Sequence, residues 1–133
     1  MTHKWDNEAS EEQRARTAAA QAQDSALTYL RIVDDITRSG ITQTELSQAV
    51  GASLRTVQNW AAGNGIPAGA KVRRLLDVQY IVRELREVYT EEGVQIWMHA
   101  RNRNLDRKRP IDLLAVGQYD EVLAEAERVS GAM

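Results

Sequence analysis

The sequence contains no cysteine, and this absence narrows the chemistry that the chain can perform. Without thiols the chain has no disulfide, no thiolate nucleophile and no thiolate zinc site. Phenylalanine is also absent, and only two prolines occur in 133 residues. No apolar run approaches the roughly 18 residues that a membrane span requires, and the N-terminus lacks the pattern of a signal peptide. We therefore expect a cytoplasmic protein that does not enter a membrane.

Catalytic signatures are scarce as well. The only histidines are His3 and His99, and the sequence has no pair with metal-ligand spacing, no phosphate-binding glycine loop and no nucleophile elbow. The sequence therefore predicts no enzyme, no metal site and no cofactor, and we interpret His99 as a structural or surface residue. Alanine is abundant and β-branched runs are few, so helix is the expected secondary structure and all-α the expected fold class.

Apolar spacing and capping residues divide the sequence into a series of helices. Residues 1–24 are expected to form a flexible or partly helical arm, because they offer little to bury. A helix capped by Asp24 or Ser25 should run to about residue 38. Further helices are predicted at about 43–50, 54–61 and 68–89, after Thr90, from Pro110 to Gly117, and from an Asp120 cap to about Ser130. The broad apolar face of 68–89 predicts packing on two sides, and Trp97 is expected to join the core.

Residues 43–60 have the pattern of a helix-turn-helix. Apolar residues are placed to pack the two helices together, small Ser47 suits their close approach, and Gly51 suits a turn with positive φ. Outward residues of such a motif can contact the bases or phosphates of operator DNA. The candidate DNA-binding residues are Thr44, Ser53, Arg55, Thr56, Gln58 and Asn59. A helix pair that only packs or dimerises is the alternative interpretation.

Charge argues against strong DNA binding by a single copy. The chain has a net charge of −2, whereas neutralisation of phosphates usually requires a basic protein. Residues 40–62 hold one base, Arg55, and one acid, Glu45. We expect additional help from nearby cations such as Arg74, from a dimer with two recognition helices, or from a complex with another protein.

The segment 101–109 concentrates positive charge. Its five bases are accompanied by a single acid, Asp106. The segment is either a solvated loop between helices or a positive surface for an acidic cleft or a phosphate-bearing ligand. Asn102 and Asn104 are expected at turn or left-handed positions. Since guanidinium groups grip carboxylates across interfaces, the favoured partner contacts are Arg103, Arg107, Lys108 and Arg109.

The C-terminal half resembles the toxin-binding domain of Xre/MbcA/ParS-type antitoxins. The resemblance is carried by Trp97, Asn102, Leu105, Arg109-Pro110, the run Ile111-Asp112-Leu113-Leu114, Gly117 and Val122-Leu123. In that family an Xre-like helix-turn-helix precedes this domain, so the resemblance covers about residues 25–130. Relatives often have Gly-Gly where this chain has Asp106-Arg107. We therefore expect the conformation of this loop to differ.

The resemblance implies an antitoxin of a type II toxin-antitoxin system. Such a protein neutralises a RES-domain toxin, which consumes NAD⁺, by covering its active site, and it binds operator DNA for autorepression. The implied organisation is an arm at 1–24, an Xre-like helix-turn-helix domain at 25–67 and a helical toxin-binding domain at 68–133. The implied toxin-binding residues are Arg101, Asn102, Arg103, Arg107, Lys108, Arg109, Pro110, Leu113 and Gly117.

Two further expectations concern assembly. The chain is expected to form a homodimer through the 68–89 helix and Trp97, because the apolar face of that helix is broader than one-sided packing requires. The alternative function is a stand-alone helix-turn-helix transcriptional repressor whose C-terminal helices only dimerise. The identity of the neighbouring gene would distinguish the two, because a RES-type toxin favours the antitoxin.

Overall fold

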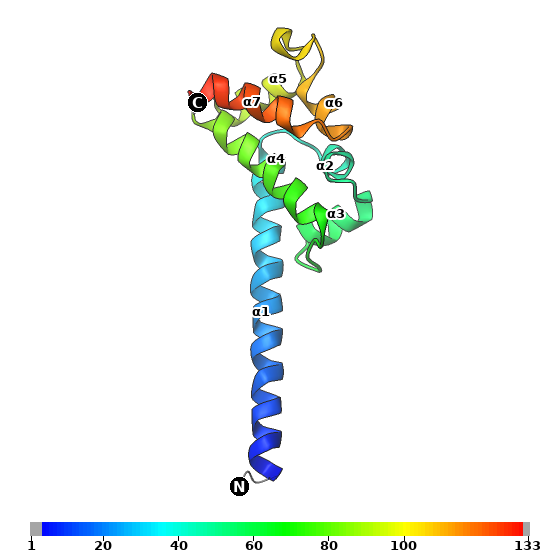
Figure 1. Cartoon of the computed structure of the whole chain (residues 1–133), viewed down its shortest axis with the longest axis vertical. Coiled ribbons are helices and arrows are strands. Elements are labelled where there is room, and N and C mark those ends of the chain that lie inside the picture. Colours follow the sequence, from blue (N-terminus) through cyan, green and yellow to red (C-terminus); the bar gives the residue numbers. More distant parts are fainter. Residues whose placement is uncertain (1–3, 132–133) are drawn as a thin grey trace.

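The structure is a computed structural model that describes residues 4–131, and the described chain is helical without any strand (Figure 1). The elements are α1 (Lys4–Arg38), α2 (Gln43–Val50), α3 (Leu54–Ala61), α4 (Ala70–Arg86), α5 (Glu91–His99), the 3-10 turn η1 (Arg103–Leu105), α6 (Pro110–Ala115) and α7 (Tyr119–Ser130). The all-α prediction is confirmed. Helices α2 to α7 gather around one end of α1, and the rest of α1 extends away as a rod (Figure 1).

Helix α1 is longer than the sequence predicted. It runs without a break from Lys4 to Arg38, so the predicted start at Asp24 or Ser25 is wrong. The reason is that residues 10–24 contain no glycine or proline and many alanines, and Glu12 pairs with Arg16 one turn later at 2.7 Å. These side chains are exposed all round. Within residues 10–38, only the last part of α1 buries an apolar face, and Leu27 remains 44% exposed.

The helix-turn-helix forms with the predicted bounds. Thr42 caps α2 in a reciprocal capping box with Glu45, and the Ser53 side chain caps α3 by accepting a hydrogen bond from the Thr56 N–H. Gly51 between them has φ of 74°, which only glycine adopts without strain. A Cβ atom at this position would also lie 2.6 Å from Nη1 of Arg74, but this flexible side chain could move aside, so the positive φ is the reason that the turn needs glycine.

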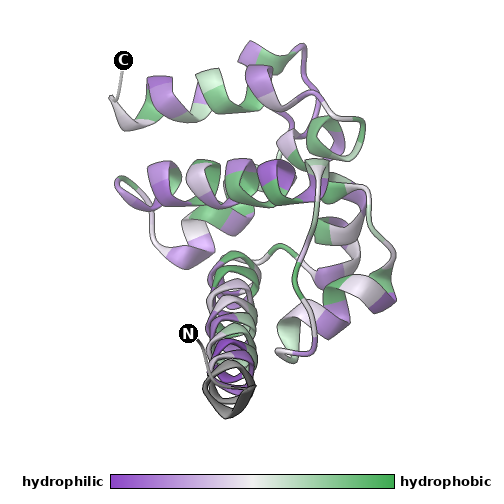
Figure 2. Ribbon diagram, turned by 60° about the horizontal axis from the view of Figure 1, so that its bottom comes forward, coloured by the Kyte–Doolittle hydropathy of each residue, from purple (hydrophilic) through white to green (hydrophobic). Residues whose placement is uncertain are grey.

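Helix α4 is the central element of the core. It contacts α1 and α2 as well as α5 and α7, which confirms the prediction that it packs on more than one side. Its ends lie inside the predicted range of 68–89, and two residues expected on the apolar face, Leu76 and Val88, are exposed. In the hydropathy colouring of Figure 2 hydrophobic and hydrophilic residues alternate along the helices of the bundle. The fully buried α4 residues are Leu75, Val78, Ile81, Val82 and Leu85.

The C-terminal helices begin and end at recognisable residues. Thr90 caps α5, Pro110 occupies the first turn of α6, and Gly131 ends α7 with φ of 77°. The predicted Asp120 cap is wrong, because α7 starts at Tyr119 and Asp120 lies in its first turn. An acidic residue there still interacts favourably with the helix dipole. Trp97 is partly buried against the core.

One hydrophobic core joins the two halves of the bundle. Buried residues from the helix-turn-helix, such as Val50 and Trp60, belong to the same cluster as Met98, Leu114 and Val122. An ion pair between Asp35 of α1 and Arg86 of α4 lies at the edge of this core. The core therefore continues across the predicted boundary between 67 and 68, and α4 connects its two sides.

Candidate DNA-binding and partner-binding surfaces

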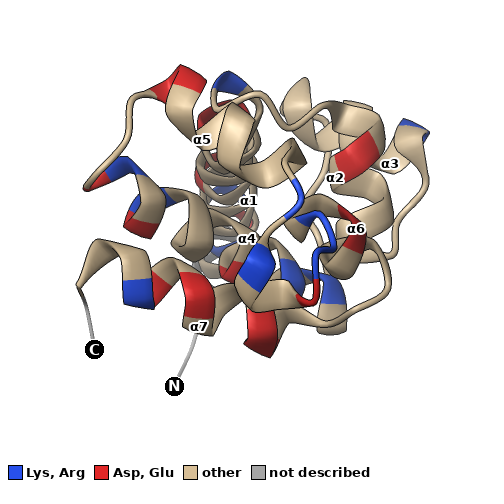
Figure 3. Cartoon of the chain, turned by 90° about the horizontal axis from the view of Figure 1, so that it is seen from above, with Lys and Arg blue, Asp and Glu red and all other residues tan. Residues whose placement is uncertain are grey.

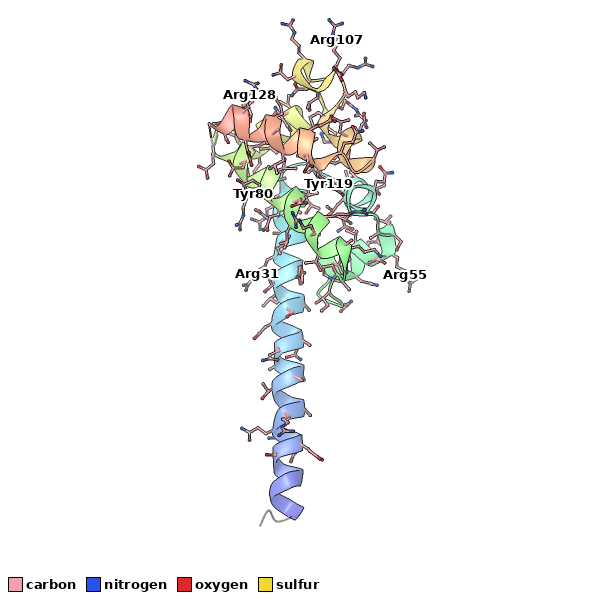
Figure 4. All side chains as sticks on the ribbon, in the orientation of Figure 1. Arg31, Arg55, Tyr80, Arg107, Tyr119 and Arg128 are labelled. Carbon is pink, nitrogen blue, oxygen red and sulfur yellow. The ribbon has the colours of Figure 1, made fainter. Side chains whose placement is uncertain are left out.

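Helix α3 presents a polar face to solvent. Val57 and Trp60 anchor the helix in the core, while Arg55, Gln58 and Asn59 are exposed. Figure 4 shows Arg55 directed away from the body of the molecule. This is the arrangement that major-groove recognition requires of a second helix.

Two hydroxyls at the start of α3 are engaged with each other. Ser53 Oγ and Thr56 Oγ1 lie 2.8 Å apart, and Ser53 Oγ also accepts from the Thr56 N–H at 3.1 Å. Thr56 is half-buried, so its side chain is less available to DNA than those of its neighbours. Thr44 is exposed on α2. All six predicted DNA-binding residues thus lie on the helix-turn-helix. Five of them are exposed, and Thr56 is half-buried.

The basic residues of 101–109 project from a loop with a defined backbone. The Asn102 N–H donates to the Lys108 carbonyl at 3.0 Å, and the Arg107 N–H donates to the Asn102 carbonyl at 2.8 Å. The Asn102 side chain accepts from the Asn104 N–H at 2.9 Å, and Leu105 is buried beneath the loop. These bonds hold the loop in one shape before any partner arrives.

The left-handed residues of this loop are Asp106 and Arg107, with φ of 55° and 62°. The prediction of turn positions for Asn102 and Asn104 is confirmed, because Asn102 caps the 3-10 turn that contains Asn104. Its left-handed alternative is wrong, since neither residue has positive φ. Positive φ is costly for residues other than glycine. Glycine would adopt this left-handed conformation at lower cost. In this chain Asp106 and Arg107 adopt it instead.

Four cations of the loop are exposed and form no ion pair within the described residues 4–131. They are Arg101, Arg103, Arg107 and Lys108. Figure 3 shows the basic residues gathered in one loop between α5 and α6, and Figure 4 shows Arg107 at the end of the molecule opposite the free part of α1. Together these four residues form the basic loop surface.

Arg109 is bound within the chain. Its Nε and Nη2 atoms each donate to Asp112 at 2.8 Å. These hydrogen bonds hold the pKa of the Asp112 carboxyl below its usual value, and the opposing effect of burial is smaller. A hollow of about 290 Å³ lies here, lined by Arg101, Arg107, Lys108, Arg109 and Asp112.

The remaining predicted toxin-binding residues are Asn102, Pro110, Leu113 and Gly117, and they differ in burial. Pro110 and Leu113 are buried in α6, so their side chains hold the helix in the core and are not offered to a partner. Asn102 is half-buried and shapes the loop. Gly117 is exposed with φ of 81° and follows the end of α6.

Two polar contacts that the sequence did not predict brace the loop and α5. Glu125 of α7 is buried and accepts hydrogen bonds from Arg128 at 2.6 Å and from Asn104 at 3.0 Å. The bond from Arg128 is the main cause that lowers the pKa of Glu125, and burial opposes it. No local signal could have found the Asn104 contact, because the two residues are 21 positions apart.

His99 connects α5 to the helix-turn-helix. Its Nδ1 lies 2.7 Å from the Gln95 carbonyl oxygen, and its Nε2 lies 2.8 Å from a carboxylate oxygen of Glu45. Each ring nitrogen therefore lies within hydrogen-bond distance of an oxygen. Burial alone would raise the pKa of Glu45, but hydrogen bonds from the Thr42 N–H and from His99 together lower it. His99 is therefore a bridging residue between two elements.

Two further findings on the described residues concern membrane spans and metal sites. None of the helices within 4–131 is long and apolar enough to cross a membrane. The same part of the chain holds no group of three or more His, Asp or Glu side chains arranged to bind a metal ion.

Comparison with known proteins identifies close relatives. No protein-family model matches the sequence. The mycobacterial cidal antitoxin MbcA of Mycobacterium tuberculosis is 37% identical over 89 residues, which cover 67% of this chain and 79% of the relative. The probable mycobacterial cidal antitoxin Rv3188 of the same organism is 36% identical over 104 residues, covering 78% and 89%.

A solved structure agrees with the sequence comparison. The crystal structure of the M. tuberculosis MbcT–MbcA toxin-antitoxin complex contains a chain that matches with a TM-score of 0.64 and 32% identity. The match covers 78% of this chain and 95% of that one. Similarity at this level of identity and coverage extends over most of the relative, including the helical arrangement described above. The chain belongs to the MbcA family of antitoxins.

Proposed function

We propose that the chain is the antitoxin of a type II toxin-antitoxin system and that it inhibits a RES-domain toxin, which consumes NAD⁺. Membership of the MbcA family and the solved toxin-antitoxin complex of a relative support an antitoxin with a protein partner. The nature of the toxin follows from the resemblance of the C-terminal motif. The proposed toxin-binding unit is 68–133, the proposed helix-turn-helix unit is 25–67, and residues 1–24 are assigned to the arm.

The basic loop surface is the observation that carries the proposal. Four exposed cations without ion pairs in the described chain form a local positive surface on a protein of net charge −2, and such a surface attracts an acidic one. The loop is also ordered by its own hydrogen bonds, so little conformational entropy is lost when it binds. Arginine side chains such as Arg103 and Arg107 can form paired hydrogen bonds with toxin carboxylates.

Inhibition would then work by occlusion. The loop stands out from the bundle at the end away from the free part of α1 (Figure 1), so it can enter a concave active site without a clash from the long helix. Once it is seated, the toxin's substrate has no path to the catalytic residues. The chain needs no chemistry of its own for this role.

The test is an NAD⁺-consumption assay with the toxin encoded by the adjacent gene. Wild-type chain should suppress NAD⁺ loss at equimolar concentration. A variant with both Arg103→Glu and Arg107→Glu should bind about a hundredfold more weakly, because four units of charge change at the interface. We choose these residues over Arg109, whose replacement would also break its ion pair with Asp112.

A matched control keeps the charge change but moves it elsewhere. Arg14→Glu with Arg31→Glu alters the net charge equally, and both residues are exposed on α1. This control should inhibit like the wild type. Equal inhibition by the loop variant would disprove the basic loop surface as the toxin contact, and no inhibition by the wild type would disprove the antitoxin proposal for this toxin.

We also propose that α3 binds operator DNA for autorepression. The support is the exposed polar face of α3, with Arg55, Gln58 and Asn59 directed outward, and the position of Arg74 beside the turn at Gly51. A gel-shift assay with the promoter of its own operon should show binding that Arg55→Ala with Asn59→Ala abolishes. Retained binding by that variant would disprove this recognition surface. A shift together with no toxin complex would favour the stand-alone repressor.

The third proposal is a homodimer through α4. Leu76 and Tyr80, one turn apart on α4, remain 42% and 43% exposed. Two copies are needed to place two recognition helices about one DNA turn apart. Sedimentation at micromolar concentration should give a dimer that Leu76→Lys weakens, and a wild-type monomer would contradict the proposal.

A further inference from the structure

The two most exposed large hydrophobic residues of the described chain are Ile96 and Val116. Their exposed fractions are 62% and 70%. Ile96 lies on the outer side of α5, whose inner side buries Val94 and Met98. A single exposed aliphatic side chain is common, but one at the edge of a groove close to a charged surface is typical of a binding site.

Ile96 borders a groove between α5 and the segment that joins α1 to α2. The groove has a volume of about 550 Å³ and is lined by Gly40, Thr42, Glu45, Gln95, Ile96 and His99. Its walls are held by several direct contacts. His99 bonds to Glu45 across the groove, and Gly40 approaches Gln95 so closely that a Cβ at 40 would lie 2.4 Å from that side chain. The groove is therefore preformed.

The groove and the hollow beside the basic loop surface lie on helices that pack together. Helix α6, which carries Asp112 of the hollow, contacts both α2 and α5, which carry Glu45 and Ile96 of the groove. The charge of Arg109 acts on Glu45, and the charge of His99 acts on Asp112, in agreement with this packing.

We propose that the toxin contact extends from the basic loop surface into this groove, where an apolar toxin side chain packs against Ile96. This inference rests on the proposed antitoxin function. The partner it fits is a protein surface with a projecting aliphatic or aromatic side chain bordered by carboxylates. The apolar contact supplies affinity at the centre, and the cations supply orientation and association rate at the rim.

The chemistry of the groove favours a protein over nucleic acid. Glu45 is at its wall, and the hydrogen bonds that lower the pKa of Glu45 keep it ionised at neutral pH. A phosphate in the groove would be repelled by this carboxylate. The exposed side chain of Ile96 at the groove suits a hydrophobic side chain of the partner.

The experiment measures the dissociation constant between the toxin encoded by the adjacent gene and four forms of the full-length chain. These are the wild type, Ile96→Lys, Ile96→Ala, and the control Leu27→Lys, which alters an exposed leucine on α1. Ile96→Lys should weaken binding about a hundredfold and Ile96→Ala about tenfold. Leu27→Lys should bind like the wild type. Circular dichroism and thermal unfolding confirm that each form is folded.

Salt separates the apolar contact from the charged one. The loss caused by Ile96→Ala should stay constant as salt rises, whereas the loss caused by Arg103→Glu with Arg107→Glu should shrink because exposed charges are screened. If the wild type binds the toxin and both Ile96 variants bind equally well, the groove is not part of the interface and only this inference fails. If the wild type does not bind at all, the proposed function fails first.

Discussion

At the residue scale, Asp106 and Arg107 adopt a backbone conformation that glycine would adopt more readily. Both residues have positive φ, although neither is glycine. Each left-handed residue of this kind costs about 1–2 kcal/mol relative to glycine, and glycine loses about 0.5–1 kcal/mol through its freedom in the unfolded chain. The hydrogen bonds of the loop offset this cost. Strain of this kind is frequently found where a loop must keep a functional shape.

Asp106→Gly should therefore stabilise the protein. We expect the free energy of unfolding to rise by up to about 1 kcal/mol, because the strain at 106 is relieved and the exposed side chain has no ion pair to lose within the described residues. Urea unfolding measures the change. A decrease would mean that the Asp106 side chain stabilises the loop in a way that outweighs its backbone strain.

Glu125 gives the chain a stability that depends on pH. The folded state lowers its pKa below the ordinary value of 4.5, so its contribution is complete above that value and is lost as pH falls through the lowered pKa. Glu125→Gln should cost about 1 kcal/mol near pH 7, since the bonds to the ionised carboxylate are weakened. The difference between the two proteins should shrink as the pH falls below 4.5 and through the lowered pKa of Glu125. Unfolding curves over a series of falling pH values test this, and a constant difference would show that charge is not the cause.

Residue-scale contacts were the least predictable part of the site. The Ser53 and Thr90 caps could be predicted because a cap depends on a few adjacent residues. The bridge between His99 and Glu45 joins positions 54 apart, and Asn104 meets Glu125 only through the packing of α7. The burial of Pro110 and Leu113 likewise depends on how α6 sits in the bundle.

At the element scale, the sequence predicted the bounds of a helix correctly where capping residues and a glycine mark its ends. The bounds of α2 and α3 follow from Thr42, Gly51 and Ser53, each of which acts within one turn. The start of α1 was missed because the sequence offers a good cap at 24–25, yet the residues before it also favour helix. A cap that is possible is not used when the preceding segment can continue the same helix.

The two parts of α1 should differ in stability. Residues 10–24 are exposed and pack on nothing in the chain, whereas Val33 and Ile36 are buried. Isolated helices fray readily in water. Hydrogen exchange should be fast for the amides of 10–24 and slow for those of 32–38. Equal protection along the whole helix would show that the exposed part is covered in solution, which a dimer could provide.

At the scale of the whole molecule, the basic loop surface and the exposed face of α3 lie on different sides of one bundle. Arg107 and Arg55 point in different directions in Figure 4, so toxin and DNA need not compete for the same surface. The two surfaces share the core around α4 and are linked by the contact between His99 and Glu45. The arrangement suits a protein that binds two partners together.

The shared core predicts cooperative unfolding. Because buried residues of both halves pack in one cluster, calorimetry of the full chain should show a single transition. The proposed division between 67 and 68 would then mark a difference in function and not an independent folding unit. Two separate transitions would contradict this.

The most direct test of the central claim is co-purification of the adjacent gene product with the tagged chain. Wild type and the charge control on α1 should retain the toxin in a stoichiometric complex. The variant with Arg103→Glu and Arg107→Glu, expressed at the same level and equally folded, should lose it. Retention of the toxin by that variant at the wild-type level would contradict the account, because the basic loop surface could then not be what holds the toxin.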